Sequence, residues 1–386
     1  MHLIEVTDSS LANEFIQVNV RINASNANYI RPLDKDIHDV FDKKKNKAFR
    51  HGAVTRWILK DDDGNSIGRI AAFINKKYKN KGDEMPVGGI GFFDCINDQS
   101  AAELLFNVAK HWLIATGVEA MDGPINFGER DRWWGLLVEG FEPPIYCMNF
   151  NPPYYATLFE QYGFRAFVNQ LCFALKVSDP LQPKFFERHA KIAADPQFSA
   201  RHIRKNNLKK FAEDFTIVYN KAWAGHGGLK ELHPEVVLKM FKQMKPIMDE
   251  RVIWFGYYKE NPVAIWTNLP DINQWFRFLN GNFNWWGKVR FIWYKATRKC
   301  TKFTGLVFGI IPEWQGKGVD SYIIVEGAKI IQGKHLYNDY EMQWIGEFNP
   351  KMINIAESLG TYRSRKLITY RYLFDQTREF KPHPIV

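Results

Sequence analysis

The sequence has few cysteines, no long hydrophobic run, and no basic segment ahead of an apolar one at its start. Only four cysteines occur among 386 residues, widely spaced and without a CxxC pair. This spacing excludes a disulfide framework or a zinc site of closely spaced ligands, and it is typical of buried thiols in a reducing compartment. No stretch approaches about 18 uncharged apolar residues. We therefore expect a cytoplasmic protein without a membrane span and without a bound metal.

The composition is otherwise that of a folded protein with a basic surface. Hydrophobic residues make up 46% of the chain, enough for each half to bury a core of its own. Lysine and arginine number 52 against 42 acidic residues, and the net charge of +10 favours anionic partners. The basic runs at 43–47 and 201–210 lack the motif of a nucleic-acid-binding fold. We interpret them as solvated faces and do not expect nucleic acid as a partner.

Hydrophobic periodicity predicts an α/β order in the first half. Apolar residues at helical spacing predict a helix at 10–24, and two β-rich runs joined by Asp63-Gly64-Asn65 predict a hairpin over 54–75. The remaining elements alternate between strand and helix: 87–96, 100–116, 120–123, 153–162 and a strand that ends at 177. This order predicts mixed α/β layers.

The second half repeats this order after a polar, proline-punctuated stretch at 178–206. A hairpin is predicted to turn at Glu260-Asn261-Pro262. Helices precede it and strands and helices alternate after it, at 211–224, 234–249, 304–311, 321–332, 341–345, 350–358 and 367–374. We predict a tandem duplication of one α/β unit, with domains at 1–177 and 207–386 and a linker at 178–206.

The residues best suited to chemistry lie at 309–320, where a strand joins a helix through a turn with two glycines. Such a turn lets backbone N–H groups converge on one point, where the helix dipole adds positive potential. It is suited to a phosphate or pyrophosphate, to which Gln315 and Lys317 could add donors. The alternative is that the glycines only make the turn.

This turn resembles the acyl-CoA-binding motif of the GNAT (Gcn5-related N-acetyltransferase) superfamily. Ile310, Pro312, Gln315 and Gly318 match its apolar, proline, Arg/Gln and glycine positions, whereas Asp320 stands where glycine or alanine is expected. A carboxylate there repels a pyrophosphate, unless Asp320 is the N-cap of the helix and displaces the phosphates slightly. The resemblance implies acetyl-CoA or another acyl-CoA as co-substrate, contacted by residues in and beside the turn: Phe308, Gly309, Ile310, Gln315, Gly316, Lys317, Gly318, Val319, Asp320 and Asn349.

A second stretch, 349–360, resembles the family's helix Asn-x-x-Ala-x-x-x-Tyr-x-x-x-Gly. In that family the tyrosine often protonates the departing CoA thiolate, but Ala356 stands at its position here. A methyl group cannot donate a proton, so another acid acts or no transfer occurs. Either of two tyrosines ahead of this helix, Tyr337 or Tyr340, could replace the lost acid, and we predict Tyr340. Glu347 is predicted as the base, and a solvated surface carboxylate is its alternative.

The first half resembles the same fold without its cofactor loop. Residues 151–164 resemble the family helix, but 96–102 lack a glycine pair and include Asp98. We expect two tandem GNAT-like domains, the first degenerate. The expected activity is transfer of an acyl group, with acetyl favoured, from acyl-CoA to an amine at the cleft between the domains. The alternative is a non-catalytic GNAT scaffold that binds a ligand or partner.

Three further features leave alternatives open. The stretch 123–144 interleaves Trp, Arg and Glu, and it is either a polar ligand site or a packed loop. The aromatic runs at 274–278 and 283–286 either line a tunnel for an acyl chain or belong to the core. His226, in a glycine-rich loop, is a weak candidate for a substrate contact.

Overall fold

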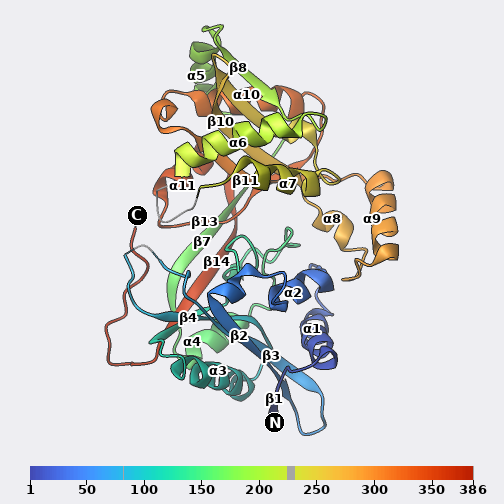
Figure 1. The fold of residues 1–386 in the computed structure, drawn as a ribbon, viewed down its shortest axis with the longest axis vertical. Coiled ribbons are helices and arrows are strands. Elements are labelled where there is room, and N and C mark those ends of the chain that lie inside the picture. Colours follow the sequence, from blue (N-terminus) through green and yellow to red (C-terminus); the bar gives the residue numbers. More distant parts are fainter. Residues whose placement is uncertain (81, 224–230, 386) are drawn as a thin grey trace.

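The computed structural model describes residues 1–80, 82–223 and 231–385, whose strands form one continuous sheet through both halves (Figure 1). The first half contains β1 (His2–Glu5), α1 (Ser9–Asn23), α2 (Asp34–Phe41), β2 (Gly52–Lys60), β3 (Ser66–Asn75), β4 (Val87–Cys95), α3 (Gln99–Ile114), β5 (Ala120–Gly123), β6 (Leu136–Glu139), α4 (Tyr155–Tyr162) and β7 (Arg165–Lys176).

The second half contains α5 (Pro183–Ala193), β8 (Phe198–His202), α6 (Leu208–Trp223), α7 (Pro234–Met244), β9 (Ile253–Tyr258), β10 (Asn261–Pro270), α8 (Asn273–Phe276), α9 (Trp285–Thr297), β11 (Lys302–Ile310), α10 (Val319–Ile331), β12 (Asp339–Met342), β13 (Ile345–Gly346), α11 (Pro350–Ser358) and β14 (Tyr362–Leu373). The predicted elements occur in the predicted order, with further elements such as α2, α8 and α9 between them, and the mixed α/β class is confirmed.

Local chemistry accounts for several element ends. The Asp8 carboxylate accepts a hydrogen bond from Leu11 N at the start of α1, and Asp98 accepts one from Ala101 N at the start of α3. Gly64 adopts a φ of 83° in the turn between β2 and β3, a conformation that favours glycine. The second hairpin turns one residue earlier than predicted, because Lys259 and Glu260 take the positive φ values and β10 already begins at Asn261.

The strands are ordered so that the two halves mirror each other. From one edge the order is β1-β2-β3-β4-β5-β14-β7-β12-β11-β10-β9-β8, with β6 beside β14 and β13 beside β7. The last strand of each half is exchanged, because β14 lies between β5 and β7, and β7 lies between β14 and β12. The buried ion pair of Arg371 Nε with Asp122 Oδ1, at 2.6 Å, joins β14 to β5. The order of elements confirms the predicted duplication.

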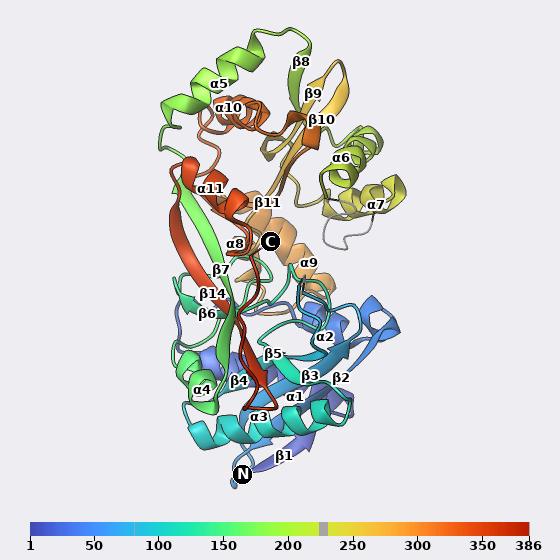
Figure 2. The same cartoon turned by 90° about the vertical axis from the view of Figure 1, so that its left-hand side faces the viewer.

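Helices cover both faces of the sheet in the second half. The α10 and α5 helices pack together on one face, and α6 and α7 pack together on the other (Figure 2). The stretch 178–206, predicted as a linker, contains α5 and the edge strand β8, which pairs with β9. The division into 1–177, 178–206 and 207–386 stays a prediction. No described helix combines the length and the apolarity needed to cross a bilayer.

Candidate active site

The two central strands of the second half diverge and leave a cavity between them. The parallel strands β11 and β12 pair only from Lys302 to Gly305 on β11, while β11 continues to Ile310. A cavity of about 420 Å³ occupies this opening and extends between α10 and α11. Its inner wall is apolar, with Trp266, Phe303, Ile324 and Ile331 among the lining residues. Its volume lies within the ~300–1,000 Å³ range of small-molecule pockets.

The main chain of β11 is available along this opening. Ile311 N donates to Val263 O on the far side, and successive residues of a strand point their N–H and C=O groups in opposite directions. The main-chain groups of Ile310 and Phe308 therefore point away from β10, toward the side from which β12 has diverged. Gln315 Nε2 donates to Ile310 O at 2.9 Å, which agrees with this direction. The available groups could accept a ligand as an additional extended strand.

The predicted phosphate turn forms at the outer end of β11. Gly316 and Gly318 have φ values of 73° and 91°, and Gly318 is the N-cap of α10, whose first N–H groups have no side-chain cap. Lys317 is exposed, with Nζ 5.1 Å from the Trp314 ring centroid. The turn therefore combines open backbone donors with a free lysine, as an anion site requires.

Asp320 is not the N-cap of this helix, so that alternative is wrong. It is the second residue of α10, and its carboxylate lies in the first turn, where the helix dipole favours negative charge. Sequence reasoning missed Arg188 on α5, an exposed residue beside the turn. A Cβ built on Gly318 would lie 3.4 Å from Arg188 Cβ. Only the packing of α5 on α10 placed Arg188 beside the turn.

Helix α11 forms one side of the cavity, and it carries Ala356 at the position where the family helix has a tyrosine. Asn349 lines the cavity and is the N-cap of α11, accepting from Met352 N at 3.2 Å. Ala356 is fully buried and also lines the cavity, so its methyl group faces the space where a tyrosine ring would otherwise project.

Tyr340 lies in the cavity wall, at the point where β11 and β12 separate. Its ring centroid is 4.6 Å from that of Phe303, and Trp266 Nε1 donates to its hydroxyl at 3.4 Å. A Cβ on Gly305 would come within 2.2 Å of the Tyr340 oxygen, so glycine is needed opposite this hydroxyl. Burial raises the pKa of Tyr340 to about 12, which keeps the hydroxyl protonated at neutral pH.

Glu347 lies outside the cavity wall. Its side chain is exposed and its Oε2 accepts from Asn169 Nδ2 of β7 at 2.7 Å, whereas the adjacent Gly346 and Phe348 line the cavity. Its assignment as a base stays a prediction. His226 lies outside the described residues.

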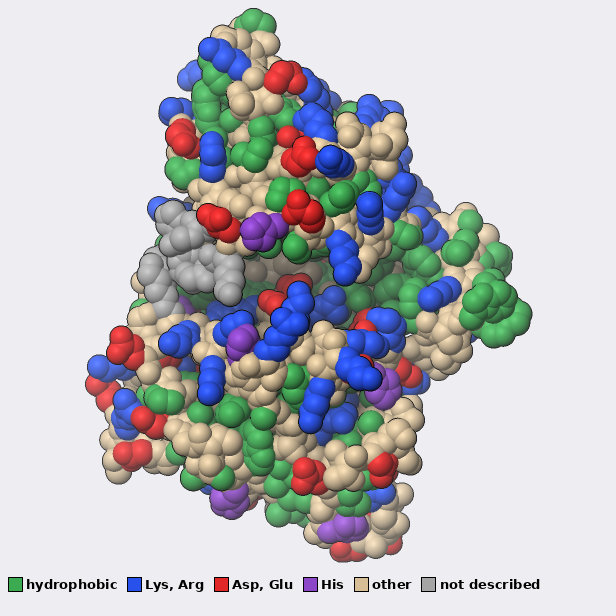
Figure 3. Space-filling model, in the orientation of Figure 1, with side chains coloured by type: hydrophobic (Ala, Val, Ile, Leu, Met, Phe, Trp, Pro, Cys, Tyr) green, Lys and Arg blue, Asp and Glu red, His purple; other side chains and the backbone are tan. Residues whose placement is uncertain are grey.

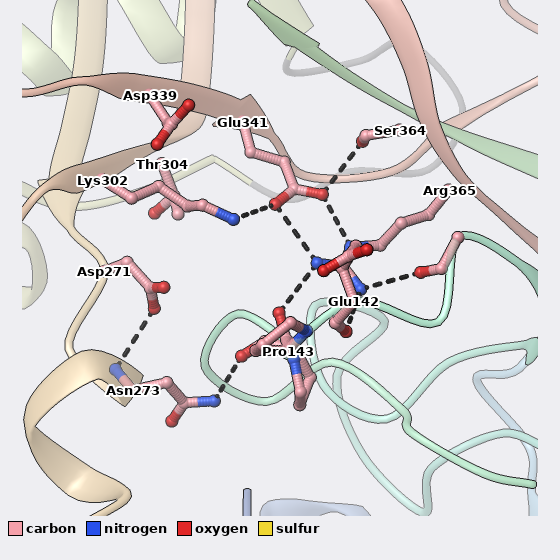
Figure 4. Close-up of polar contacts among 12 residues, drawn as sticks. Glu142, Pro143, Asp271, Asn273, Lys302, Thr304, Asp339, Glu341, Ser364 and Arg365 are labelled. Carbon is pink, nitrogen blue, oxygen red and sulfur yellow. Dashed lines mark hydrogen bonds and ion pairs between the residues drawn. The ribbon is translucent and has the colours of Figure 1, made fainter. Parts of the chain in front are cut away.

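A buried charged cluster, which sequence reasoning missed, lies where β10, β11, β12 and β14 meet the loop at 140–144 (Figure 4). Arg365 Nε donates to Glu341 Oε1 at 2.7 Å, and Lys302 Nζ donates to Glu341 Oε2 at 3.0 Å. Burial alone would raise the pKa of Glu341, but Arg365 and Lys302 outweigh it and lower that pKa. Glu341 is therefore held as a carboxylate.

Asp271, at the end of β10, is the exception in this cluster. It is buried and accepts from Asn273 N at 3.2 Å, and burial raises its pKa to about 7 despite the charge of Lys302. Among the described carboxyl groups with a shifted pKa, Asp271 is the one whose pKa is raised. A pKa near neutrality is the property expected of a group that exchanges protons at physiological pH.

The matching space in the first half is filled by aromatic side chains. Phe93 of β4 packs against Phe106 at 4.7 Å and Phe159 at 5.2 Å between ring centroids. Tyr155 OH accepts from Cys95 N, and Tyr154 OH donates to Cys95 O. The end of β4 is therefore already hydrogen-bonded where β11 is open. The predicted degeneracy of the first half has this physical basis.

The aromatic stretches are placed differently from one another. Trp133 and Trp134 are buried, so these two aromatic side chains pack in the core, and the 123–144 stretch also contains the strand β6. Trp275 and Phe276 are also core residues, whereas Trp285 and Trp286 are 67% and 66% exposed. The run 283–286 therefore lines no tunnel, and its two tryptophans do not belong to the core.

Three-dimensional comparison identifies the architecture. A tandem GNAT protein from the clavulanic acid biosynthesis pathway has a TM-score of 0.54 to this chain at 10% identity, and the match covers 96% of this chain and 98% of that one. The chain has the tandem GNAT fold. A fungal multi-domain GH3 β-N-acetylglucosaminidase with a GCN5-related glucosamine N-acetyltransferase region gives a TM-score of 0.55 at 10% identity. That match covers 96% of this chain and 38% of the longer fungal one.

Sequence comparison adds two bacterial relatives of this tandem GNAT chain. A protein of Caulobacter vibrioides named bacterial ceramide synthase is 25% identical over 374 residues, which cover 94% of this chain and 96% of that protein. The Escherichia coli protein YghO is 26% identical over 340 residues, covering 86% of this chain and 85% of its own. No protein-family profile matches the chain.

Proposed function

We propose that this protein is an acyl-CoA-dependent N-acyltransferase whose second half holds the thioester between β11 and β12. The observation that carries the proposal is the open edge of β11, which joins an apolar cavity at one end to a glycine turn at the other. Pantetheine would extend along Phe308 to Ile310, and the pyrophosphate would meet the N–H groups and Lys317 of the turn. A tandem GNAT fold supports this use of the strand opening.

The transfer would join the amine nitrogen to the thioester carbonyl carbon and break the C–S bond. The backbone N–H groups of β11 are suited to hold the carbonyl oxygen as negative charge develops on it. Tyr340 would protonate the departing thiolate, and Glu347 would take the proton of the amine through water. In this assignment Glu347→Gln lowers kcat and leaves binding of the acyl-CoA unchanged.

The cavity favours an acyl chain longer than acetyl. Its inner wall carries Trp266, Phe303, Ile324 and Ile331, which offer apolar contact beyond the point where an acetyl group would end. The Caulobacter relative is named a ceramide synthase, and a ceramide is an N-acylated long-chain amine. We therefore propose a fatty acyl group as donor and a lipid-like amine as the class of acceptor.

Calorimetric titration with acetyl-CoA and decanoyl-CoA tests the donor site. Each buried methylene contributes about 0.8 kcal/mol, so even two of them raise affinity more than tenfold. Decanoyl-CoA should bind at least tenfold more tightly than acetyl-CoA. Ala328→Phe, which fills the cavity from α10, should abolish this preference, and Ala190→Phe at an exposed position of α5 should preserve it.

The second candidate function is a GNAT scaffold that binds a ligand without transferring it. Ala356 at the tyrosine position and Asp320 in the first turn of α10 favour it, because each departs from the family pattern. Tight binding of decanoyl-CoA without release of free CoA in the presence of a range of long-chain amines would support this candidate. Failure of both thioesters to bind would contradict the acyl-CoA-dependent function and would leave a scaffold for another ligand or partner in its place.

A further inference from the structure

Helix α9 carries an exposed apolar face that the fold leaves uncovered. Among the described residues, every tryptophan that is mostly exposed lies on this helix: Trp285, Trp286 and Trp293, at 67%, 66% and 57%. Ile292 is 66% exposed and Val289 is 41% exposed. Figure 3 shows the hydrophobic side chains gathered at the tip of this protruding helix, at the right of the view.

The spacing of these residues puts them on one side of the helix. Position 289 lies four residues from 285 and from 293 and three from 292, the spacings that share a helical face, and 286 borders this face. The opposite side holds α9 to the body, where Phe291 is buried against Trp275 and Phe276. The apolar face therefore points away from the protein core.

Basic residues flank this face. Within 285–299 there are five Lys and Arg residues and no Asp or Glu: Lys288, Arg290, Lys295, Arg298 and Lys299. None of the five forms an ion pair with a carboxylate in the described structure, and their polar contacts are with main-chain oxygens and a tyrosine hydroxyl. These side chains therefore place positive charge without an ion pair beside an apolar surface rich in tryptophan.

We infer that α9 docks the protein onto an anionic lipid surface. Tryptophan is suited to the headgroup region because its ring is apolar and its N–H is polar, and Lys and Arg beside it attract acidic headgroups. A helix with an apolar face, basic flanks and no acidic residue lies in the plane of such an interface. No described helix can cross a bilayer, so the contact is peripheral. This inference is independent of acyl transfer.

Co-sedimentation of the full-length protein with vesicles tests the docking surface. Vesicles of phosphatidylcholine with about one-third phosphatidylglycerol should bind the protein at least about tenfold more strongly than phosphatidylcholine alone. Tryptophan emission should shift to the blue on binding, because exposed indoles enter a less polar medium. Raising the salt concentration should weaken the binding, since it screens the basic flanks.

Two variants and a matched control separate the contributions. Trp285→Ser, Trp286→Ser and Trp293→Ser together should abolish binding, and Lys288→Glu with Lys299→Glu should remove the preference for phosphatidylglycerol. The control replaces three exposed apolar residues elsewhere, Ile114→Ser, Phe186→Ser and Val236→Ser, and should bind as the original protein does. Circular dichroism establishes that each variant is folded.

Three results would overturn the inference: no binding to either vesicle, equal binding by the tryptophan variant and the original protein, or a loss of binding in the control variant as large as in the tryptophan variant. A dimer in solution that the tryptophan variant dissociates would also overturn it, because a second copy of the chain would then cover α9.

Discussion

At the scale of single residues, two groups stand out: the buried hydroxyl of Tyr340 in the cavity wall and the carboxyl group of Asp271, whose pKa is raised. Tyr340 contacts the cavity and has a pKa raised to about 12, so it can donate a proton but does not readily lose one to water. Asp271 has a pKa of about 7 and lies in the charged cluster with Lys302 and Glu341. Tyr340 leads to a prediction about activity, and Asp271 leads to one about the pH dependence of stability.

Replacing Tyr340 by phenylalanine should lower kcat at least tenfold and leave the KM for the acyl-CoA within threefold, because a general acid typically contributes about 10²–10⁴-fold. Stability should change by less than about 1 kcal/mol, since the hydroxyl accepts only the 3.4 Å bond from Trp266. The matched control is Tyr337→Phe, which loses a 2.8 Å bond to Asp249 outside the cavity. Equal kcat values for the two variants in steady-state assays would contradict the role of Tyr340.

Asp271 should make the folded protein less stable as pH rises toward neutrality. Its folded pKa of about 7 exceeds the ordinary value of 3.8, so between these pH values the folded state holds a proton that the unfolded state has released. The contribution of this bound proton to the free energy of unfolding is complete below about pH 4 and is lost as pH rises to 7.

Urea unfolding of the protein and of Asp271→Asn between pH 5 and 8 measures this effect. From pH 5 to 7, the free energy of unfolding of the variant should rise relative to that of the original protein by up to about 1.4 kcal/mol per pH unit. Above pH 7 the difference between the two free energies should level off. Asp63→Asn, at an exposed turn, is the control. Parallel pH profiles for the protein and Asp271→Asn would show that Asp271 titrates normally.

At the scale of elements, Arg365 connects β14 to two other parts of the structure. Its side chain is 1% exposed, and it bonds Glu341 on β12 and the carbonyl oxygens of Gly140, Glu142 and Pro143. These hydrogen bonds provide acceptors for a guanidinium group that would otherwise be buried without partners. The cluster therefore fixes where the last strand lies relative to the cavity-forming strands.

Arg365→Ala should lower the free energy of unfolding by about 3–5 kcal/mol, because it takes one cationic partner from the buried Glu341 carboxylate and removes the donor of three carbonyl groups. The control is Arg363→Ala on the same strand, whose side chain is 62% exposed and pairs with Glu357 at 3.2 Å. That change should cost less than about 1 kcal/mol. Similar losses for both variants in urea titrations would mean that the buried cluster contributes little.

At the scale of the whole molecule, the exchanged strands make each half dependent on the other. Without β14, the strands β5, β6 and β7 lose a neighbour, and the apolar side chains of β14 leave the core of the first half. An unpaired strand exposes backbone groups and apolar surface. Residues 1–177 alone should therefore fail to form a stable unit, although the sequence pattern of this range is complete.

Circular dichroism and proton NMR of the 1–177 fragment test this dependence, and little chemical-shift dispersion is expected. Tyr362 at the start of β14 pairs with Ala174 near the end of β7, so a short glycine-containing turn can join residue 177 to residue 361. A chain of 1–177 joined in this way to 361–375 should recover a dispersed spectrum. A folded 1–177 fragment would contradict the prediction.

The sequence by itself determined many of the elements and the shape of the glycine turn, because both are encoded locally. Helical and strand periodicity depends on residues a few positions apart, and the turn at 315–320 owes its shape to Gly316 and Gly318. The resemblance carried by these residues was sufficient to predict the tandem GNAT fold. Ala356 at the tyrosine position was also visible in the sequence.

Only the tertiary structure decided the exchange of β7 and β14, the cavity, the charged cluster and the exposed face of α9. These depend on contacts between distant residues, such as the pair of Asp122 with Arg371, 249 positions apart. An aromatic run has the same composition whether it is buried or exposed, so Trp285 and Trp286 gave no local signal of their position. Tertiary packing decided which aromatic residues are exposed, because Phe291 is the one large side chain of α9 that is buried in the core.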